Sequence, residues 1–307
     1  MSWELVVIQL LNGLQLGILL FLVASGLTLV FGIMDFLNLA HGSLYMAGAF
    51  FCASMTAATG SFVLGILLAL PLSALLGVAV EVIVARRLYR RDHLDQVLAT
   101  FGLILVFDTL AHMIWGAEGR SVPLPEWLRG QVVLPGDFTF PTYRVAIIAV
   151  GLFVAALLYL IVNRTRLGML IRAGASNRVM VGALGIDIRT LFTLVFAIGA
   201  AFAGLAGMMI APITEASIGM GNDIIILTFV VIIIGGLGSV KGAFVGAMLV
   251  GLIDTMGRSF LDDVFALFLS PNAAETSAPA VSAMLIYILM AVVLFFRPQG
   301  LFPPQLR

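Results

Sequence analysis

Residue types that perform acid–base, nucleophilic or metal chemistry are sparse in this sequence. Its three histidines, His41, His93 and His112, fall in different segments, and neither a His-Glu-x-x-His metal motif nor a Gly-x-Ser-x-Gly nucleophile turn occurs. Cys52 is the only cysteine, which excludes an internal disulfide and a cysteine-based zinc site. We therefore expect no catalytic residues and no metal site, and we predict that the chain is not an enzyme.

A nucleotide-binding loop is also missing. The pattern Gly-x-x-x-x-Gly-Lys-Ser/Thr, whose backbone cradles phosphates, does not occur, even in the glycine-rich residues 235–242. Any ATP-driven process must therefore use a partner's ATPase, and no cofactor is expected on this chain. The formal charge is zero, with 16 basic and 16 acidic residues, so nucleic acid is not an expected partner.

Two stretches, residues 35–43 and 235–242, bring polar groups and glycines into apolar surroundings. Each contains Gly-Ser followed shortly by Gly-Ala-Phe, at spacings that differ by two residues. Such similarity is typical of transporters built from related halves with broken helices, and chance similarity in a glycine-rich apolar chain explains it equally well. Ordinary helix packing is the competing interpretation for the small residues.

The elements that hold these stretches must lie in a bilayer, because 62% of the residues are hydrophobic and only 10% are charged, against about 25% in soluble proteins. A transmembrane helix needs about 20 apolar residues. Windows of this kind lie at residues 5–34, 36–80, 96–117, 145–163, 190–214, 224–240, 242–261 and 276–296.

The window at 36–80 is long enough for two spans, which gives about nine. Broken or re-entrant segments near Asn38 and Gly238 extend the range to eight to ten. All spans must be helices, because a lipid-facing backbone has to satisfy its own hydrogen bonds. The fold class is thus an all-α polytopic membrane protein, with residues 1–307 as one transmembrane domain and membrane lipid as its surroundings.

The arginines predict the orientation, since cytoplasmic loops are enriched in Lys and Arg. One cluster lies at residues 86–91 and another at 164–189, and an even number of spans separates each from Arg297 and Arg307. We therefore place these clusters and the C-terminus in the cytoplasm, with the N-terminus outside. The proline-rich loop at 116–144 is then external.

Ionisable residues within the apolar windows occur in pairs near helical spacing. The pairs are Asp108 with His112, Asp254 with Arg258, and Glu81 with Arg86. We interpret the first as making a satisfied polar contact in preference to a proton relay, the second as mutual neutralisation, and the third as reaching the membrane interface. So few intramembrane acids give little support to ion-coupled transport.

The segment at 164–189 is basic but has apolar residues at the spacing of a short amphipathic helix: Met169, Leu170, Ala173, Met180, Ala183 and Leu184. One interpretation is a connector lying on lipid headgroups. The other is a docking element for a cytosolic protein.

Four motifs in order resemble the LivH-type permease of the branched-chain amino-acid ABC importers. They lie at residues 32–49, 172–187, 235–243 and 297–302, and the resemblance extends over essentially the whole chain. It implies a permease subunit that moves branched-chain or other hydrophobic amino acids across the bacterial inner membrane by alternating access. Related permeases serve urea, amides and other amino acids, which leaves the substrate open. The alternative function is an ion-coupled secondary transporter or a channel for small polar solutes such as urea or amides.

The resemblance also implies partners: a second related permease, two cytosolic ATP-binding subunits that use ATP and Mg, and a periplasmic substrate-binding protein. It places ATPase coupling at Arg172, Ala173, Asn177, Arg178, Ala183, Gly185 and Asp187. Our candidates for the translocation path are Asn38, His41, Gly42, Ser43, Gly235, Gly236, Gly238 and Ser239. In that path, the amide and hydroxyl groups would offer transient hydrogen bonds to an amino acid.

Overall fold

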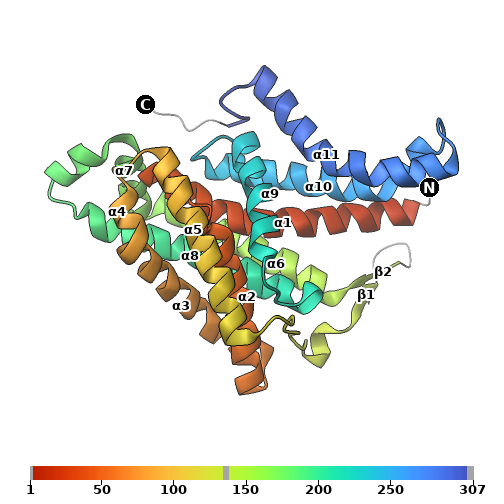
Figure 1. Cartoon of the computed structure of the whole chain (residues 1–307), viewed down its shortest axis with the longest axis horizontal. Helices are drawn as coiled ribbons and strands as arrows, with labels where there is room; N and C mark the ends of the chain where they lie inside the picture. The colour runs from red at the N-terminus through yellow and green to blue at the C-terminus, as the bar shows by residue number, and fades with distance from the viewer. Residues whose placement is uncertain (1–2, 134–137, 303–307) are drawn as a thin grey trace.

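A computed structural model describes residues 3–133 and 138–302, and Arg307 lies outside them. The described chain is almost entirely helical (Figure 1). Its helices are α1 (Trp3–Met34), α2 (His41–Thr59), α3 (Phe62–Val80), η1 (Glu81–Ala85), α4 (Arg86–Leu88), α5 (His93–Trp115), η2 (Glu126–Leu128), α6 (Thr142–Arg164), α7 (Arg166–Ala183), α8 (Ile188–Thr214), α9 (Met220–Gly235), α10 (Val240–Phe265) and α11 (Pro271–Phe296).

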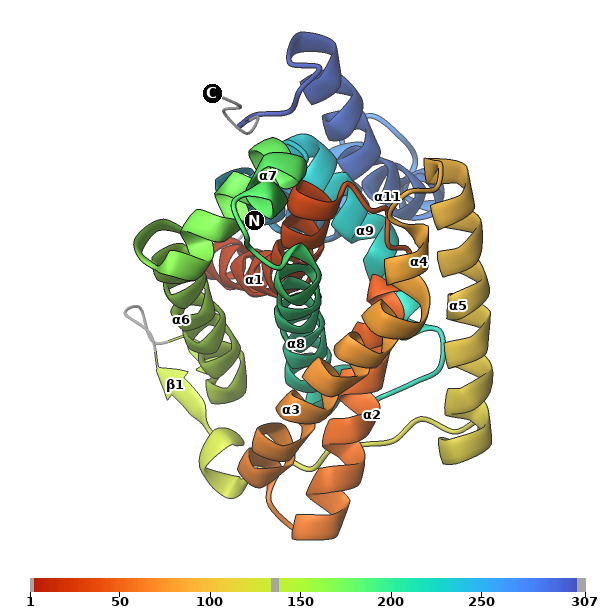
Figure 2. The same ribbon diagram turned by 90° about the vertical axis from the view of Figure 1, so that its left-hand side faces the viewer.

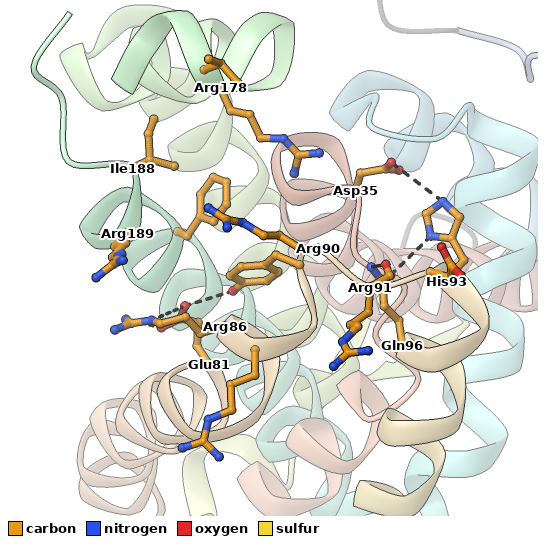
Figure 3. Close-up of a pocket in the computed structure, with 15 residues that line it drawn as sticks. Asp35, Glu81, Arg86, Arg90, Arg91, His93, Gln96, Arg178, Ile188 and Arg189 are labelled. Atoms are coloured by element: carbon orange, nitrogen blue, oxygen red, sulfur yellow. Dashed lines mark hydrogen bonds and ion pairs between the residues drawn. The ribbon is translucent and has the colours of Figure 1, made fainter. Parts of the chain in front are cut away.

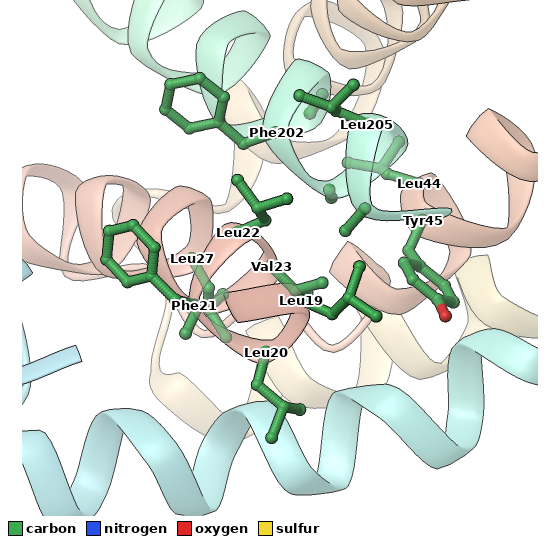
Figure 4. Close-up of a cluster of buried hydrophobic side chains, with 14 of the residues drawn as sticks. Leu19, Leu20, Phe21, Leu22, Val23, Leu27, Leu44, Tyr45, Phe202 and Leu205 are labelled. Atoms are coloured by element: carbon green, nitrogen blue, oxygen red, sulfur yellow. The ribbon is translucent and has the colours of Figure 1, made fainter. Parts of the chain in front are cut away.

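The centre of the molecule is formed by α1, α2, α8 and α10. Helix α1 is buried over most of its length and runs antiparallel to α10, so that Gly13 and Gly17 meet Leu252 and Ala247 (Figure 1). Leucines, valines and phenylalanines of α1 pack against α2 and α8 in the hydrophobic cluster of Figure 4. Glycine permits these close approaches, and dispersion contacts then hold the helices together where no hydrophobic effect operates.

The outer helices have a different surface. In the end-on view of Figure 2, α8 lies in the middle while α5 and α6 lie at opposite sides. Helices α3, α5, α6 and α11 bury only a minority of their most apolar window and expose large side chains such as Leu67, Leu98, Phe153 and Phe295. Exposed apolar surfaces of this kind suit helices that face lipid or another membrane subunit.

The predicted set of about nine spans is confirmed. Within the described residues, seven helices are long and apolar enough to cross a membrane. Helices α2 and α9 complete the count. Helix α2 is more polar than these seven but is enclosed by protein over residues 41–50. Helix α9 is about 24 Å long at 1.5 Å per residue. The long window at 36–80 contains two helices, α2 and α3, as predicted.

The segment predicted to be an external loop has a compact structure in its described part. It contains η2, around Trp127, and the antiparallel strands β1 (Gln131–Val133) and β2 (Thr139–Pro141), with Val132 opposite Phe140. A backbone bridge between Arg120 and Ala216 attaches it to the end of α8. The described part of the loop is therefore attached to the bundle next to the end of α8.

Candidate coupling surface and translocation path

The two arginine clusters meet in one groove. Residues of α4, the α4–α5 turn, α7 and α8 line an open cavity of about 970 Å³, shown in Figure 3. Its cations are Arg86, Arg87, Arg90, Arg91, Arg178 and Arg189. Segments far apart in the sequence thus place their arginines at the same end of the bundle, as the predicted topology requires.

Glu81 anchors this groove. Its side chain is 0% exposed and lies at the arginine end of the bundle, and its position at the membrane interface stays a prediction. The carboxylate accepts hydrogen bonds from Arg86 Nη2 at 2.8 Å, from the Tyr89 hydroxyl at 3.1 Å and from the Thr193 hydroxyl at 2.8 Å. These partners offset the cost of burying its charge.

The local backbone explains why the sequence did not reveal this site. Residues Glu81–Ala85 form a π-helical turn, and the Arg86 N–H donates to the carbonyl of Glu81. A regular α-helix points residues five apart in different directions, whereas the wider π turn brings Glu81 and Arg86 onto one face. Such turns occur frequently at functional sites.

The acidic residues of the other two pairs, Asp254 and Asp108, also have partners in the structure. Asp254 and Arg258 form the predicted ion pair, with Arg258 Nε 2.9 Å from Asp254 Oδ2. Asp108 makes a polar contact, as predicted, with a residue of another helix: it accepts a hydrogen bond from Asn222 Nδ2 on α9 at 3.4 Å. This contact joins α5 to α9. The two helices are far apart in the sequence, so hydrophobic periodicity could not predict the contact.

Helix α7 contains the predicted coupling segment, but it is neither short nor straight. Thr165 caps its start by accepting from Gly168 N at 3.2 Å. Asn177 leaves the helical conformation, with φ −155° and ψ 92°, and its side chain caps a second helical part by accepting from Met180 N at 2.9 Å. Asn177 therefore acts as a joint within α7.

The face of α7 that packs inward also differs from the predicted apolar face. Gly168, Ile171, Gly174 and Val181 are buried. The predicted face has Met169, Met180, Ala183 and Leu184 exposed, with Leu170 and Ala173 partly buried. An exposed apolar surface of this extent is available to a partner or to lipid.

The remaining predicted coupling residues surround the end of α7. Arg178 lines the arginine groove and donates to the carbonyl of Met34, the last residue of α1, at 3.3 Å. Gly185 has a left-handed φ of 85° in the turn after α7. Asp187 caps α8, and hydrogen bonds from the Thr190 hydroxyl and the Arg189 backbone lower its pKa.

The first break in the apolar helices, residues 35–40, joins α1 to α2. Its backbone is held by α5: Leu37 N donates to Gln96 Oε1 at 3.1 Å and Leu39 N to Thr100 Oγ1 at 3.3 Å. Asn38 is 1% exposed, and neither its Nδ2 nor its Oδ1 has a partner in the structure. Sequence analysis missed Gln96 and Thr100, although two polar residues four apart on an apolar helix are a usable signal.

Beyond the first break, α2 is packed tightly. His41 places Nε2 3.2 Å from the carbonyl of Val23 and leaves Nδ1 unpartnered, and Ser43 is buried. A Cβ added at Gly42 would lie 2.1 Å from the carbonyl oxygen of Gly221 on α9. Gly42 therefore serves a close contact between helices.

The second break, residues 236–239, joins α9 to α10. Gly236 and Gly238 have positive φ values of 107° and 82°, and Ser239 caps α10 by accepting from Gly242 N at 3.1 Å. Gly235 packs directly on Gly242, where an added Cβ would meet backbone at 2.3 Å. Gly238 also approaches Gly32, two residues before the end of α1, so that the two breaks flank the same helix end.

This arrangement defines a helical membrane subunit with a charged surface at one end and two polar breaks inside, the general construction of a permease. The model of the family "Branched-chain amino acid transport system / permease component" matches residues 9–294. The chain belongs to this family.

Named relatives agree with the family match. The chain is 28% identical to the high-affinity branched-chain amino acid transport system permease protein BraD of Pseudomonas aeruginosa, over 95% of this chain and 94% of the relative. It is 28% identical to LivH of Escherichia coli K12, over 82% and 86% of the two chains, and 26% identical to LivM of the same organism, over 92% and 68%. No solved structure matches the chain.

Proposed function

We propose that this chain is the translocation subunit of an ATP-binding-cassette importer that carries branched-chain or other hydrophobic amino acids across the bacterial inner membrane. The observation that carries the proposal is the family match, which runs from residue 9 to residue 294 and thus includes both breaks and α7. The named relatives are permease proteins of high-affinity branched-chain amino acid transport systems.

The importer requires partners. We assign ATP and Mg to two cytosolic ATP-binding subunits, because this sequence has no phosphate-binding loop. A second permease completes the membrane part, in keeping with the resemblance of this chain to both LivH and LivM of one organism. A periplasmic binding protein delivers the amino acid and performs most of the selection.

Coupling to the ATPase runs through α7 in this proposal. Its exposed residues dock on the ATP-binding subunit, and the hydrogen bond from Arg178 to the Met34 carbonyl connects α7 to the end of α1. The first break follows Met34 directly, so a displacement of α7 acts on the end of α1 and on the first break. Asn177, as the joint of α7, lets the Arg178 end move while the Ile171 end stays packed. Alternating access needs an element that can pack in two arrangements, and a joint at Asn177 is an element of this kind.

The translocation path in this proposal passes the two breaks. Asn38 supports this assignment, because a buried amide with no partner for either polar atom is costly unless a ligand or water satisfies it. Ser43 and Ser239 provide hydroxyl groups at the start of α2 and α10.

Reconstitution tests the function. Proteoliposomes that contain the chain with its two ATPases, its second permease and the binding protein should take up leucine only when ATP is present. Uptake driven by a proton or sodium gradient alone, or continuous flux without nucleotide, would establish the secondary-transporter or channel alternative instead.

Two further experiments test the docking surface and the orientation. Ala183→Glu should abolish co-purification of the ATPase, while Ala117→Glu, at an exposed position in the predicted external loop, should not. Cysteines at Arg90 and Arg178 should react with a membrane-impermeant thiol reagent only from the cytoplasm, and the native Cys52 is buried. Reaction from outside would reverse the topology, in which the N-terminus is external and the C-terminus cytoplasmic.

A further inference from the structure

A second cavity, of about 470 Å³, lies beside the second break. It is an open cavity lined by the last third of α1, the end of α6, the middle of α7 and the start of α10, in the region where α1, α6 and α7 come together in Figure 2. Its volume falls in the range of about 300–1,000 Å³ that is typical of small-molecule sites. None of the residues in the arginine groove lines it.

The charge of this cavity is one-sided. Arg172 and Lys241 line it, and no Asp or Glu does. Neither cation takes part in the ion pairs formed among the described residues, while the Arg172 guanidinium donates a hydrogen bond to the carbonyl of Val162, which also lines the cavity. Ser239, Val240 and Lys241 form the start of α10, and the first turn of a long helix adds partial positive charge from its free N–H groups. The cavity is therefore complementary to an anion.

The rest of the lining is mainly aliphatic. Leu29, Ile33, Val162 and Ile171 contribute from three different helices. Among them lies Thr28, which is 1% exposed and whose hydroxyl has no hydrogen-bond partner in the structure. A mainly apolar cavity with one unsatisfied polar group and two cations suits a small ligand that has a hydrocarbon part and a carboxylate.

We propose that this cavity binds an aliphatic amino acid, with its carboxylate toward Arg172 and Lys241, its ammonium group donating to the Thr28 hydroxyl, and its side chain against Leu29, Ile33 and Ile171. The inference rests on the proposed function and gives the transported amino acid a place in the permease. Arg172 belongs to α7, so the helix that docks on the ATPase also contributes a ligand to the substrate. Displacement of α7 then removes a charge partner from the carboxylate and favours release.

Lys241 makes the proposal directly testable, because it is the only lysine of the 307 residues. The assembled transporter in lipid nanodiscs, without binding protein or nucleotide, is treated with an N-hydroxysuccinimide ester, and acylation of the Lys241 peptide is followed by mass spectrometry. L-leucine should slow the acylation. L-leucinol, which lacks the carboxylate, and glycine, which lacks the side chain, should leave it unchanged.

Three results would overturn the site: acylation that leucine does not slow, equal protection by leucinol, and protection that follows the phosphatidylglycerol content of the nanodisc instead of leucine. The last would assign the cavity to a lipid headgroup. ATP-driven uptake without leucine protection would overturn the site alone, and leucine protection without ATP-driven uptake would overturn only the proposed function.

A variant pair supplies an independent readout. Lys241→Gln should weaken equilibrium binding of radiolabelled leucine about tenfold, the loss expected for one charge-assisted hydrogen bond. Arg166→Gln removes a charge at the start of α7, away from the cavity lining, and should leave leucine binding unchanged. Equal loss in both variants would mean that general charge at this end of the bundle, and not the cavity, attracts leucine.

Discussion

The two breaks in the apolar helices solve the same problem by different means. Side chains of another helix, Gln96 and Thr100 on α5, hold the backbone of the first break. Backbone groups hold the surroundings of the second, where Leu301 N and Phe302 N donate to the carbonyls of Ile234 and Gly235 at 2.9 Å. The first break therefore depends on the position of α5, and the second on glycine conformations and on the chain after α11.

The breaks also differ in what they leave unsatisfied. Asn38 and His41 keep buried polar atoms without partners at the first break. At the second break Ser239 is used as a helix cap, and the adjacent cavity supplies the opening. A buried polar group inside the bundle and a cavity near its end are complementary parts of a path. Variants at one break should change that break and leave the other unchanged.

The largest effect is expected from Gly236→Ala. Its φ of 107° is strained for any residue with a Cβ, and the added carbon would lie 2.9 Å from the carbonyl oxygen of Phe302. Thermal unfolding in detergent should show a loss of about 3 kcal/mol or more, with faster amide exchange at the second break only. Gly102→Ala, in α5 with open space around the new carbon, should be neutral or stabilising by up to about 1 kcal/mol.

Gln96→Leu should loosen the first break selectively. It removes the acceptor for Leu37 N and the donor to the carbonyls of Leu88 and Arg91, and unpaired buried groups cost about 1–3 kcal/mol. Hydrogen exchange should rise at residues 35–40 while residues 236–239 stay protected. Thr109→Val, elsewhere on α5, is the control, and equal exchange in both variants would contradict the role of Gln96.

Ser239→Ala should cost about 1 kcal/mol through loss of the cap on α10. Ser61→Ala removes the corresponding cap of α3 and provides a matched comparison. Both variants should unfold at lower temperature, but only the change at Ser239 should alter leucine protection of Lys241. Altered protection in the Ser61 variant would indicate a global effect.

Asn38→Leu is expected to have the smallest effect on stability. Because the amide has no partner, its replacement by an apolar side chain should be neutral or stabilising by about 1 kcal/mol. Uptake in proteoliposomes should nevertheless fall. A clear loss of stability would show that Asn38 has a structural partner and would remove it from the path.

Much of the helical framework could be predicted from the sequence, because a span must be apolar over a fixed length whatever surrounds it. The window at 36–80, for example, predicted the two helices α2 and α3. The candidate site could be predicted less completely from the sequence. A π turn redirects Glu81, a joint at Asn177 divides α7, and neither follows from periodicity.

The candidate cavity shows the same limit. Arg172, Gly238 and Ser239 were predicted as parts of two separate functions, and the structure brings them together with Lys241. Thr28 and Ile33 belong to a helix that is apolar on every side, so no pattern marks the face that they share. Only packing against α6 and α7 makes that face distinct.

The burial of α1 has a consequence for biosynthesis. Chains are made from the N-terminus, so α1 enters the bilayer before α8 and α10, which later enclose it, exist. Its predominantly apolar surface allows it to remain in lipid meanwhile, as insertion followed by helix association requires. The order of synthesis thus explains why the most enclosed helix of the mature bundle is composed like a lipid-exposed one.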